Sequence, residues 1–402
     1  MTAALTELTR TDDVDDVDDL ARPQHHPSSN RVGVLATVRA LTPMVRAHAD
    51  AIERGRRLPP AVFCELLEAG MFHLLAPRRF GGREVNVLTA LEALEAFAAV
   101  DGSTAWVLMI NNNAGMIPAF LEEAAAAEIY ADDPTAVIAG ALVPSGIACS
   151  VRGGYRVSGR WAFASGVEHS AWVVAAGRVD GGDVRAFVVP AEDVTVVDTW
   201  SVSGLRGTGS HDFEVHDTFV PARRSFWLTD RPAQPGALYR FPIRSLGAAA
   251  IAAVTLGIGR GALDALTELA GTKTPTMTSH ALRDRPYVQT ELARAEAILR
   301  SARTWLFESV RQAWMDVVAG RTVTPHDQAL LRLAATYAVE RAAETVDIAQ
   351  RLAGGSAIFT RSPLERAFRD VHTATQHFSV QPTMYEPVGR ALLHLPPEGL
   401  AL

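Results

Sequence analysis

Near the C-terminus, two histidines and an aromatic residue stand close together: His372, His377 and, directly after it, Phe378. An imidazole has an ordinary pKa of about 6.5, so a histidine can accept or donate a proton near neutral pH. A metal site shared by the two histidines is not expected, because positions five apart lie on different faces of a helix. The alternative to a catalytic role is that both are ordinary polar positions on a helix.

The loop from Gly204 to Ser210 is a second group suited to chemistry, because glycines alternate there with residues that donate hydrogen bonds. Arg206, Thr208 and Ser210 supply side-chain donors, and the glycines leave backbone N–H groups accessible. Such a combination suits a pyrophosphate or a similar acceptor. A glycine-serine hairpin loop without a ligand is the alternative interpretation.

Residues 31–134 are expected to be helical, because apolar residues recur there at intervals of three and four, for example at Leu88, Leu91 and Leu94. Residues 1–30 are expected to form a disordered acidic tail, since they cannot bury enough apolar surface to become ordered. The aspartates of this tail lack the glycine and the closing glutamate of a calcium-binding loop, and no metal is expected.

Residues 135–232 are expected to form a β domain. The glycine pairs Gly153-Gly154 and Gly181-Gly182 lie between short apolar runs, which is typical of β-hairpins. A further strand pair is expected across Phe187–Val189 and Asp212–Val215.

Residues 233–402 are expected to form an antiparallel helical bundle. Helical periodicity returns there in four long blocks, at 246–270, 285–319, 325–353 and 363–395. The apolar run from Leu246 to Gly259 is well short of the roughly 20 residues that span a bilayer. It therefore predicts a buried helix of the bundle.

The composition is that of a globular protein of two or three domains, with 402 residues, 48% hydrophobic and 21% charged. Most of the formal net charge of −7 lies in the acidic N-terminus, so neither nucleic acid nor a membrane is an implied partner. Cys64 and Cys149 do not suggest a disulfide framework, and the N-terminus lacks the order of a signal peptide. A cytoplasmic location is expected.

Three motifs in the C-terminal part resemble the acyl-CoA dehydrogenase superfamily. They are Leu352-Ala353-Gly354-Gly355-Ser356, Ser362-Pro363-Leu364-Glu365-Arg366 and Phe368-Arg369-Asp370. The resemblance implies an α+β multidomain fold with an N-terminal all-α domain, a central β-barrel domain and a C-terminal four-helix bundle. Counting from Arg369-Asp370, the catalytic glutamate of the dehydrogenases would fall at Phe378, which cannot accept a proton.

His377 instead resembles the active-site histidine of a sister group, the group D two-component flavin-dependent monooxygenases, which include aromatic and steroid hydroxylases. The stretch Gly159–Gly166 is similar to the Gly-x-Trp-x-Phe-x-Ser-Gly segment that lies against the flavin in that group, and Arg206–Ser210 resembles its Arg-Gly-Thr-Gly-Ser loop. The resemblance implies that His377 and Ser165 are catalytic. It implies flavin contacts at Trp161, Phe163, Ser165, Arg206, Thr208, Ser210, Arg283, Gly354 and Gly355, and substrate contacts at Ser145 and Phe378.

Several of these assignments have a structural alternative. Trp161 and Phe163 could pack in the core of the sheet, and Arg283 could be a solvated residue at the start of a helix. Gly354 and Gly355 could cap a helix. The run Asn111-Asn112-Asn113 could face a substrate or satisfy its amides at a helix end.

The function implied by the resemblance is that of an oxygenase component. Reduced flavin, FAD rather than FMN, would come from a separate NAD(P)H:flavin reductase, since no Gly-x-Gly-x-x-Gly follows a predicted strand. It would react with O2 to a C4a-hydroperoxide that hydroxylates an aromatic, indolic or polycyclic small molecule. The family also implies a homo-oligomer, a dimer of dimers, in which Arg283 reaches the flavin of a neighbouring subunit.

Three rival functions remain open. The first is an acyl-CoA dehydrogenase with its base relocated to Glu386, although Pro387 and the shift of eight residues argue against it. The second is an amino-sugar N-oxygenase of the same fold. The third is a flavin-free scaffold, which would be expected to have lost the two flavin motifs that this chain keeps.

Overall fold

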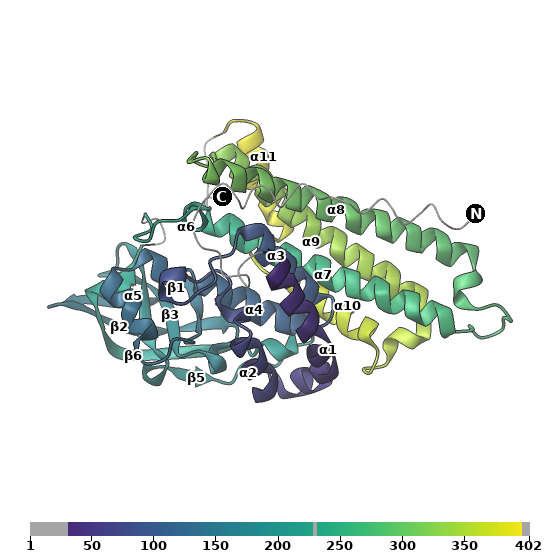
Figure 1. Cartoon of the computed structure of the whole chain (residues 1–402), viewed down its shortest axis with the longest axis horizontal. Helices are drawn as coiled ribbons and strands as arrows, with labels where there is room; N and C mark the ends of the chain where they lie inside the picture. The colour runs from purple at the N-terminus through teal and green to yellow at the C-terminus, as the bar shows by residue number, and fades with distance from the viewer. Residues whose placement is uncertain (1–30, 228–230, 396–402) are drawn as a thin grey trace.

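The computed structural model describes residues 31–227 and 231–395. The β-sheet lies at one end of the molecule, the long helices extend from the other end, and α1 to α4 pack between them (Figure 1). The tail predicted at residues 1–30 lies outside the described residues.

The N-terminal part is helical, as its apolar spacing predicts. Its α-helices are α1 (Arg31–Gly55), α2 (Pro60–Glu68), α3 (Val87–Ala98), α4 (Gly102–Ala114) and α5 (Glu123–Ala131). Asn86 caps α3 by accepting a hydrogen bond from the Thr89 N–H, and Asp101 caps α4 in the same way from Thr104. Helix α4 is buried along most of its length, so most of its side chains contact other elements in the interior of the protein.

The central part is one seven-stranded sheet. The strands are β1 (Ile138–Val151), β2 (Gly154–Ala164), β3 (Trp172–Val179), β4 (Val184–Pro190), β5 (Thr195–Val197), β6 (His211–Pro221) and β7 (Ser225–Phe226), in the order β5-β6-β2-β1-β3-β4-β7. The two predicted glycine turns are present and join β1 to β2 and β3 to β4. Trp161, Phe187 and Phe213 meet in one core, so the sheet curls like a barrel, although β5 and β7 remain its two edges.

The expected strand pair across 187–189 and 212–215 is wrong as a pair. Both segments are strands, but β4 pairs with β3 and β7, whereas β6 pairs with β2 and β5. The reason is the parallel pairing of β1 with β3, which leaves β3, β1 and β2 between β4 and β6.

Two irregularities in the sheet expose side chains at the candidate site. Between Trp161 and Ala164, strand β2 holds one residue more than the facing stretch of β6, and Phe163 takes a φ of +64° there. In β1 the pairing with β3 jumps from Ala141 to Gly146. The residues between them, 142–145, include the exposed Leu142 and Val143.

The C-terminal part contains α6 (Ala237–Arg240), α7 (Ile243–Thr272), α8 (Pro286–Val318), α9 (Pro325–Ala353), α10 (Pro363–Ala374) and α11 (Tyr385–Leu392). The first three predicted long helices are present. Helix α7 is long and apolar enough to cross a membrane, but 83% of its apolar window is buried inside the protein, as expected for a core helix. Gly257 and Gly261 let α3 approach it, since a Cβ atom there would lie 2.2 Å from the Glu95 oxygen and 2.3 Å from the Ala99 oxygen.

The fourth predicted helix is wrong in its length. Helix α10 ends at Ala374, and a turn leads to the 3-10 helix η12 (Pro382–Met384) and then to α11. Gln381 is extended, with a ψ of 156°, as expected for a residue that precedes proline. His377 therefore lies in a turn, so the helix-face argument against a metal does not apply to it. Within residues 31–227 and 231–395, no group of three or more histidine, cysteine or acidic side chains could hold a metal ion.

Candidate active site

His377 lies in the turn after α10 with its ring among aromatic groups. Its Nδ1 accepts a hydrogen bond from the Ser379 N–H at 3.2 Å. The ring stacks on Phe378 with centroids 4.7 Å apart, and it makes a T-shaped contact with Trp106 of α4, with centroids 5.8 Å apart. His372, in contrast, binds Asp347 of α9 at 2.9 Å and takes no part in this group.

The His377 imidazole is held in its neutral form. Burial lowers its pKa to about 4, and the positive charge of Arg332 acts in the same direction. Because Nδ1 accepts a hydrogen bond, the single proton of the neutral ring lies on Nε2. His377 thus presents an N–H donor at neutral pH.

Ser165 begins a chain of three buried hydroxyl groups. Trp106 Nε1 donates to Ser165 Oγ at 3.2 Å, Ser165 and Ser210 are 2.7 Å apart, and so are Ser210 and Thr208. Thr208 ends the chain by donating to the Leu205 carbonyl oxygen at 2.8 Å. Since each hydroxyl carries one proton, this last bond fixes the direction of the others. Ser165 therefore donates to Ser210 and accepts from Trp106.

Trp106 connects the two residues that the sequence assigns to catalysis. Its ring makes a T-shaped contact with His377, and its N–H donates to Ser165 Oγ. Sequence reasoning missed it, because nothing in the run Ala105-Trp106-Val107 resembles a catalytic motif. The available signal was that a tryptophan in a buried helix must place its N–H on an acceptor.

The Arg369-Asp370 pair holds the 204–210 loop in place. Asp370 Oδ1 accepts from the Leu205 N–H at 2.6 Å, and Arg369 donates to the Ser203 oxygen at 2.6 Å. The loop packs so closely that a Cβ atom on Gly204 would lie 2.1 Å from the Arg369 oxygen. Burial raises the pKa of Asp370 to about 7, and the Leu205 N–H opposes that shift.

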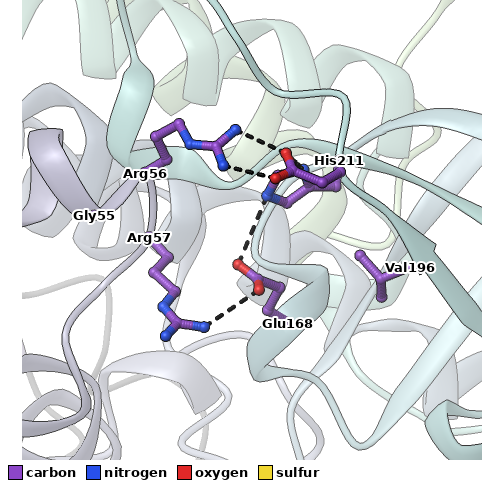
Figure 2. A pocket seen from close by; sticks show the side chains of 7 residues that line it. Gly55, Arg56, Arg57, Glu168, Val196 and His211 are labelled. Atoms are coloured by element: carbon purple, nitrogen blue, oxygen red, sulfur yellow. Dashed lines mark hydrogen bonds and ion pairs between the residues drawn. The ribbon is translucent and has the colours of Figure 1, made fainter.

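A hollow of about 450 Å³ lies next to the hydroxyl chain, between the end of α1 and the start of β6 (Figure 2). Arg56 binds both oxygens of Asp198 at 2.7 Å, and Arg57 lies 3.3 Å from Glu168. His211, the residue after Ser210, lies between the two carboxylates, 3.3 Å from Asp198 and 3.7 Å from Glu168. The two arginines and the two carboxylates of this hollow therefore pair with one another.

Comparison with known proteins identifies the family. Residues 34–129 match the acyl-CoA dehydrogenase N-terminal domain, and residues 249–382 match the acyl-CoA dehydrogenase C-terminal domain. The indole-3-acetate monooxygenase of Pseudomonas putida is 36% identical over 352 residues, covering 86% of this chain and 89% of that protein. The chain belongs to the flavin-dependent monooxygenases with the acyl-CoA dehydrogenase fold.

Two further relatives extend this comparison. The flavin-dependent monooxygenase oxygenase subunit HsaA of Rhodococcus jostii is 31% identical to this monooxygenase, over 85% of this chain and 93% of that protein. The structure of XiaF from Streptomyces sp., in complex with FADH2 and glycerol, has a TM-score of 0.87 at 26% identity and covers 92% of this chain and 98% of that one. The fold and the family predicted from the sequence are confirmed.

The structure separates the two aromatic residues of the β2 motif. Trp161 is wholly buried, stacks on Phe213 at 5.0 Å and donates to the Ala176 oxygen at 2.6 Å. In this structure the Trp161 side chain thus packs in the core, and its predicted contact with the flavin stays a prediction. Phe163 is 72% exposed, because the bulge turns it outward, and Ser145 is exposed on the neighbouring strand β1.

The loop residues assigned to the flavin bind the protein itself. Thr208 and Ser210 are buried in the hydroxyl chain, and half-buried Arg206 donates to the Val202 oxygen at 3.2 Å. The hydroxyl protons of Thr208 and Ser210 are used within the protein, and contacts of these two residues with a flavin stay a prediction. An exposed apolar surface, which a flavin ring needs, is instead present at Phe163 and at the bulged segment 142–145.

Arg283, Gly354 and Gly355 lie at the other end of the bundle. Exposed Arg283 belongs to the connection between α7 and α8, which Figure 1 shows at the end away from the sheet. Lys273, in the same connection, donates to the Ala353 oxygen at 2.6 Å, next to Gly354. One chain of the monooxygenase thus brings these three residues together but not to Ser165. Their action on a neighbour's flavin stays a prediction.

Two other groups named from the sequence are structural or remote. Asn112 accepts from the Leu74 N–H and donates to the Met71 oxygen, and Asn111 donates to the Ile138 oxygen. The asparagines therefore fasten α4 to its surroundings. Glu386, the relocated base of the dehydrogenase alternative, is exposed on α11.

Proposed function

We propose that this monooxygenase is an oxygenase component that hydroxylates an aromatic or indolic small molecule with reduced FAD. The observation that carries the proposal is the neutral, half-buried imidazole of His377, next to the position where the dehydrogenases of this fold have a carboxylate. An acyl-CoA dehydrogenase would need a base strong enough to remove an α-proton, and Phe378 offers none. The relatives named above as monooxygenases support the same function.

The residues of the chain would contribute in three ways. His377 would donate its Nε2–H to the reacting oxygen, and the buried surroundings of His377 and Trp106 would exclude water. Trp106 and Phe378 would position an aromatic ring by stacking or edge contacts. When bound, the reduced flavin supplies the electrons that activate O2.

The finer parts of the proposal concern substrate and partners. An indolic ring is the first candidate, since the relative from Pseudomonas putida is an indole-3-acetate monooxygenase. A separate NAD(P)H:flavin reductase would supply reduced FAD, with FMN as a possible substitute, because the sequence contains no predicted nicotinamide-binding motif. The enzyme would work in the cytoplasm as a homo-oligomer, a dimer of dimers.

A rapid-mixing experiment tests the proposed function. The protein is mixed with reduced FAD without oxygen and then with oxygenated buffer that contains indole-3-acetate, and flavin absorbance and products are followed. We expect delayed reoxidation and a hydroxylated product in the wild type, and loss of product in His377→Ala.

His372→Ala is the matched control, because that histidine binds Asp347 outside the site. It should keep the product yield of the wild type. Immediate reoxidation without any aromatic product, together with reduction of oxidised FAD by an acyl-CoA, would contradict the proposal and restore the dehydrogenase interpretation.

A further inference from the structure

Arg332 is a buried cation beside His377 with most of its hydrogen-bonding capacity unused. The residue lies on α9 and is 5% exposed. Its Nη1 donates to the Ser379 oxygen at 2.7 Å, and its Nε has no hydrogen-bond partner. Among residues 31–227 and 231–395, no carboxylate forms an ion pair with it.

An arginine in this position costs free energy unless an anion compensates it, because burial removes the hydration of the guanidinium group. Burial lowers the pKa of Arg332, and the nearby charge of Arg244 lowers it further. The poorly exposed arginines on α10 differ, since Arg366 binds Glu53 and Arg369 binds Glu365. Arg332 is thus a candidate to receive an anion from outside the chain.

Two other unpartnered polar groups belong to the same part of the bundle. Thr336 is one helical turn from Arg332 and so lies on the same face of α9, and its buried hydroxyl has no partner. Ser245, next to Arg244 at the start of α7, also has a buried hydroxyl without a partner. Buried polar atoms are nearly always hydrogen-bonded in proteins, so these groups are available to bind water or a polar ligand.

The free side of the guanidinium group suits a carboxylate. With Nη1 bound to Ser379, the edge formed by Nε and Nη2 is left for a second acceptor. An arginine edge of this kind binds a carboxylate through two parallel hydrogen bonds. Ser379, which binds Nη1, is two residues after His377, so the guanidinium group lies at the same turn as the imidazole.

We propose that Arg332 recognises the carboxylate of an aromatic acid whose ring lies against His377 and Trp106. The inference rests on the proposed function and refines it, because it selects anionic aromatic substrates over neutral ones. Thr336 and Ser245 would supply further hydrogen bonds at the carboxylate. Arg332 would be a specificity-determining residue that takes no part in proton transfer.

Ligand pairs that differ only by a carboxylate test the proposal. The affinities of indole-3-acetate and 3-methylindole, and of 4-hydroxyphenylacetate and 4-methylphenol, are measured by calorimetry on the purified full-length protein. We expect at least one acid to bind about tenfold or more tighter than its neutral partner. Arg332→Met should abolish that difference by weakening the acid alone, and Arg332→Lys should restore part of it.

The controls separate recognition from a role in holding the turn. Arg300→Met removes an exposed arginine of α8 and should leave all affinities unchanged. Equal weakening of acid and neutral ligand in Arg332→Met would mean that Arg332 only supports the His377 turn. Weaker binding of reduced FAD with unchanged binding of the acids would assign Arg332 to the flavin. Either result, or no binding of any acid, overturns the proposal.

The proposed function is checked separately by delayed flavin reoxidation. Delayed reoxidation without preference for acids would leave the oxygenase function intact and remove the Arg332 proposal. Preference for acids with immediate reoxidation and no product would do the reverse.

Discussion

The hydroxyl proton of Ser165 is directed at Ser210, and this limits what Ser165 can do for a flavin. The chain runs from Trp106 through Ser165 and Ser210 to Thr208, and each hydroxyl accepts one hydrogen bond and donates one. A flavin that accepts the proton of Ser165 has to interrupt this chain. Trp106 and Ser165 together form a rigid support between α4 and β2.

Removal of the Ser165 hydroxyl should destabilise the protein. In Ser165→Ala, the Trp106 N–H loses its acceptor and Ser210 loses its donor, which we expect to cost about 1–3 kcal/mol of unfolding free energy in a urea titration. Ser210→Ala interrupts the same chain one position further and is the matched control. A similar loss of stability in both variants, with weaker binding of reduced FAD in Ser165→Ala alone, would establish a direct flavin contact. Equal FAD affinities would contradict one.

His377 should make stability depend on pH on the acidic side. Its pKa of about 4 lies below the ordinary value of about 6.5, so the unfolded chain binds a proton that the folded protein does not. The stabilisation present above pH 6.5 is therefore lost as the pH falls towards 4, by up to about 3 kcal/mol. Asn at position 377 can still accept from the Ser379 N–H, so His377→Asn should lose less stability between pH 7 and 4.5. An identical loss in both proteins would contradict the shifted pKa.

The bulge in β2 shows where sequence reasoning about an element succeeds and where it fails. The motif around Trp161 and Phe163 lies in strand β2, as the hairpin pattern predicts, but regular alternation would put both side chains on the same face of the strand. The extra residue before Ala164 breaks the alternation, so Trp161 is buried and Phe163 is exposed. Register shifts depend on the facing strand β6, about 50 residues away, and a local pattern cannot reveal them.

Phe163→Gly should have opposite effects on stability and on flavin binding. A left-handed φ costs a residue with a side chain roughly 1 kcal/mol, and glycine avoids that cost. We therefore expect a higher unfolding free energy in urea and a lower affinity for reduced FAD, because the exposed ring is lost. Asp217→Gly, at a φ of +45° in β6, should be stabilising without changing FAD affinity. Unchanged FAD affinity in Phe163→Gly would exclude its ring from the site.

The connection after α10 likewise shows that a local sequence pattern does not reveal where a helix ends. The sequence predicts four helical blocks, and the fourth prediction is too long, because the break falls between Ala374 and Pro382 with no glycine to mark it. The turn that results puts His377 next to Trp106 of α4, which lies 271 residues earlier in the chain. The family resemblance points to His377, but only the packing of α4 against α10 explains how Trp106 links it to Ser165.

Buried Asp370, at the contact between α10 and the 204–210 loop, should make the folded protein less stable as the pH rises. The pKa of Asp370 is about 7, above the ordinary value near 3.8, so folding favours the protonated form. Its stabilising effect is complete below pH 4 and is lost as the pH rises through 7, by up to about 4 kcal/mol. Asp370→Asn keeps an acceptor for the Leu205 N–H and should remove this trend in urea titrations from pH 5 to 8. Asp183→Asn, at an exposed turn, should keep it, and an unchanged trend in Asp370→Asn would contradict the assignment.

For the molecule as a whole, the sequence predicts the order of helices, sheet and bundle. It does not predict whether one chain holds all the residues of the flavin site. Periodicity reports which segments are helices, but it says nothing about distance between ends of a bundle. Arg283 and Gly354 lie at the end away from the sheet, so a flavin next to Ser165 meets them only if a second copy supplies them. The predicted homo-oligomer therefore implies that a neighbouring subunit binds the adenosine half of FAD.

This contact with the adenosine half can be tested by comparing the binding of reduced FAD and reduced FMN. Arg283→Glu should weaken the binding of reduced FAD by about tenfold, in line with the loss of one charge-assisted contact to the dinucleotide. Reduced FMN lacks the adenosine half, so its affinity should be unchanged. Arg285→Glu alters charge equally at an exposed position two residues along and serves as the control. If both variants weaken FAD and FMN alike, the effect is general electrostatic repulsion, and Arg283 then makes no specific contact with a neighbour's cofactor.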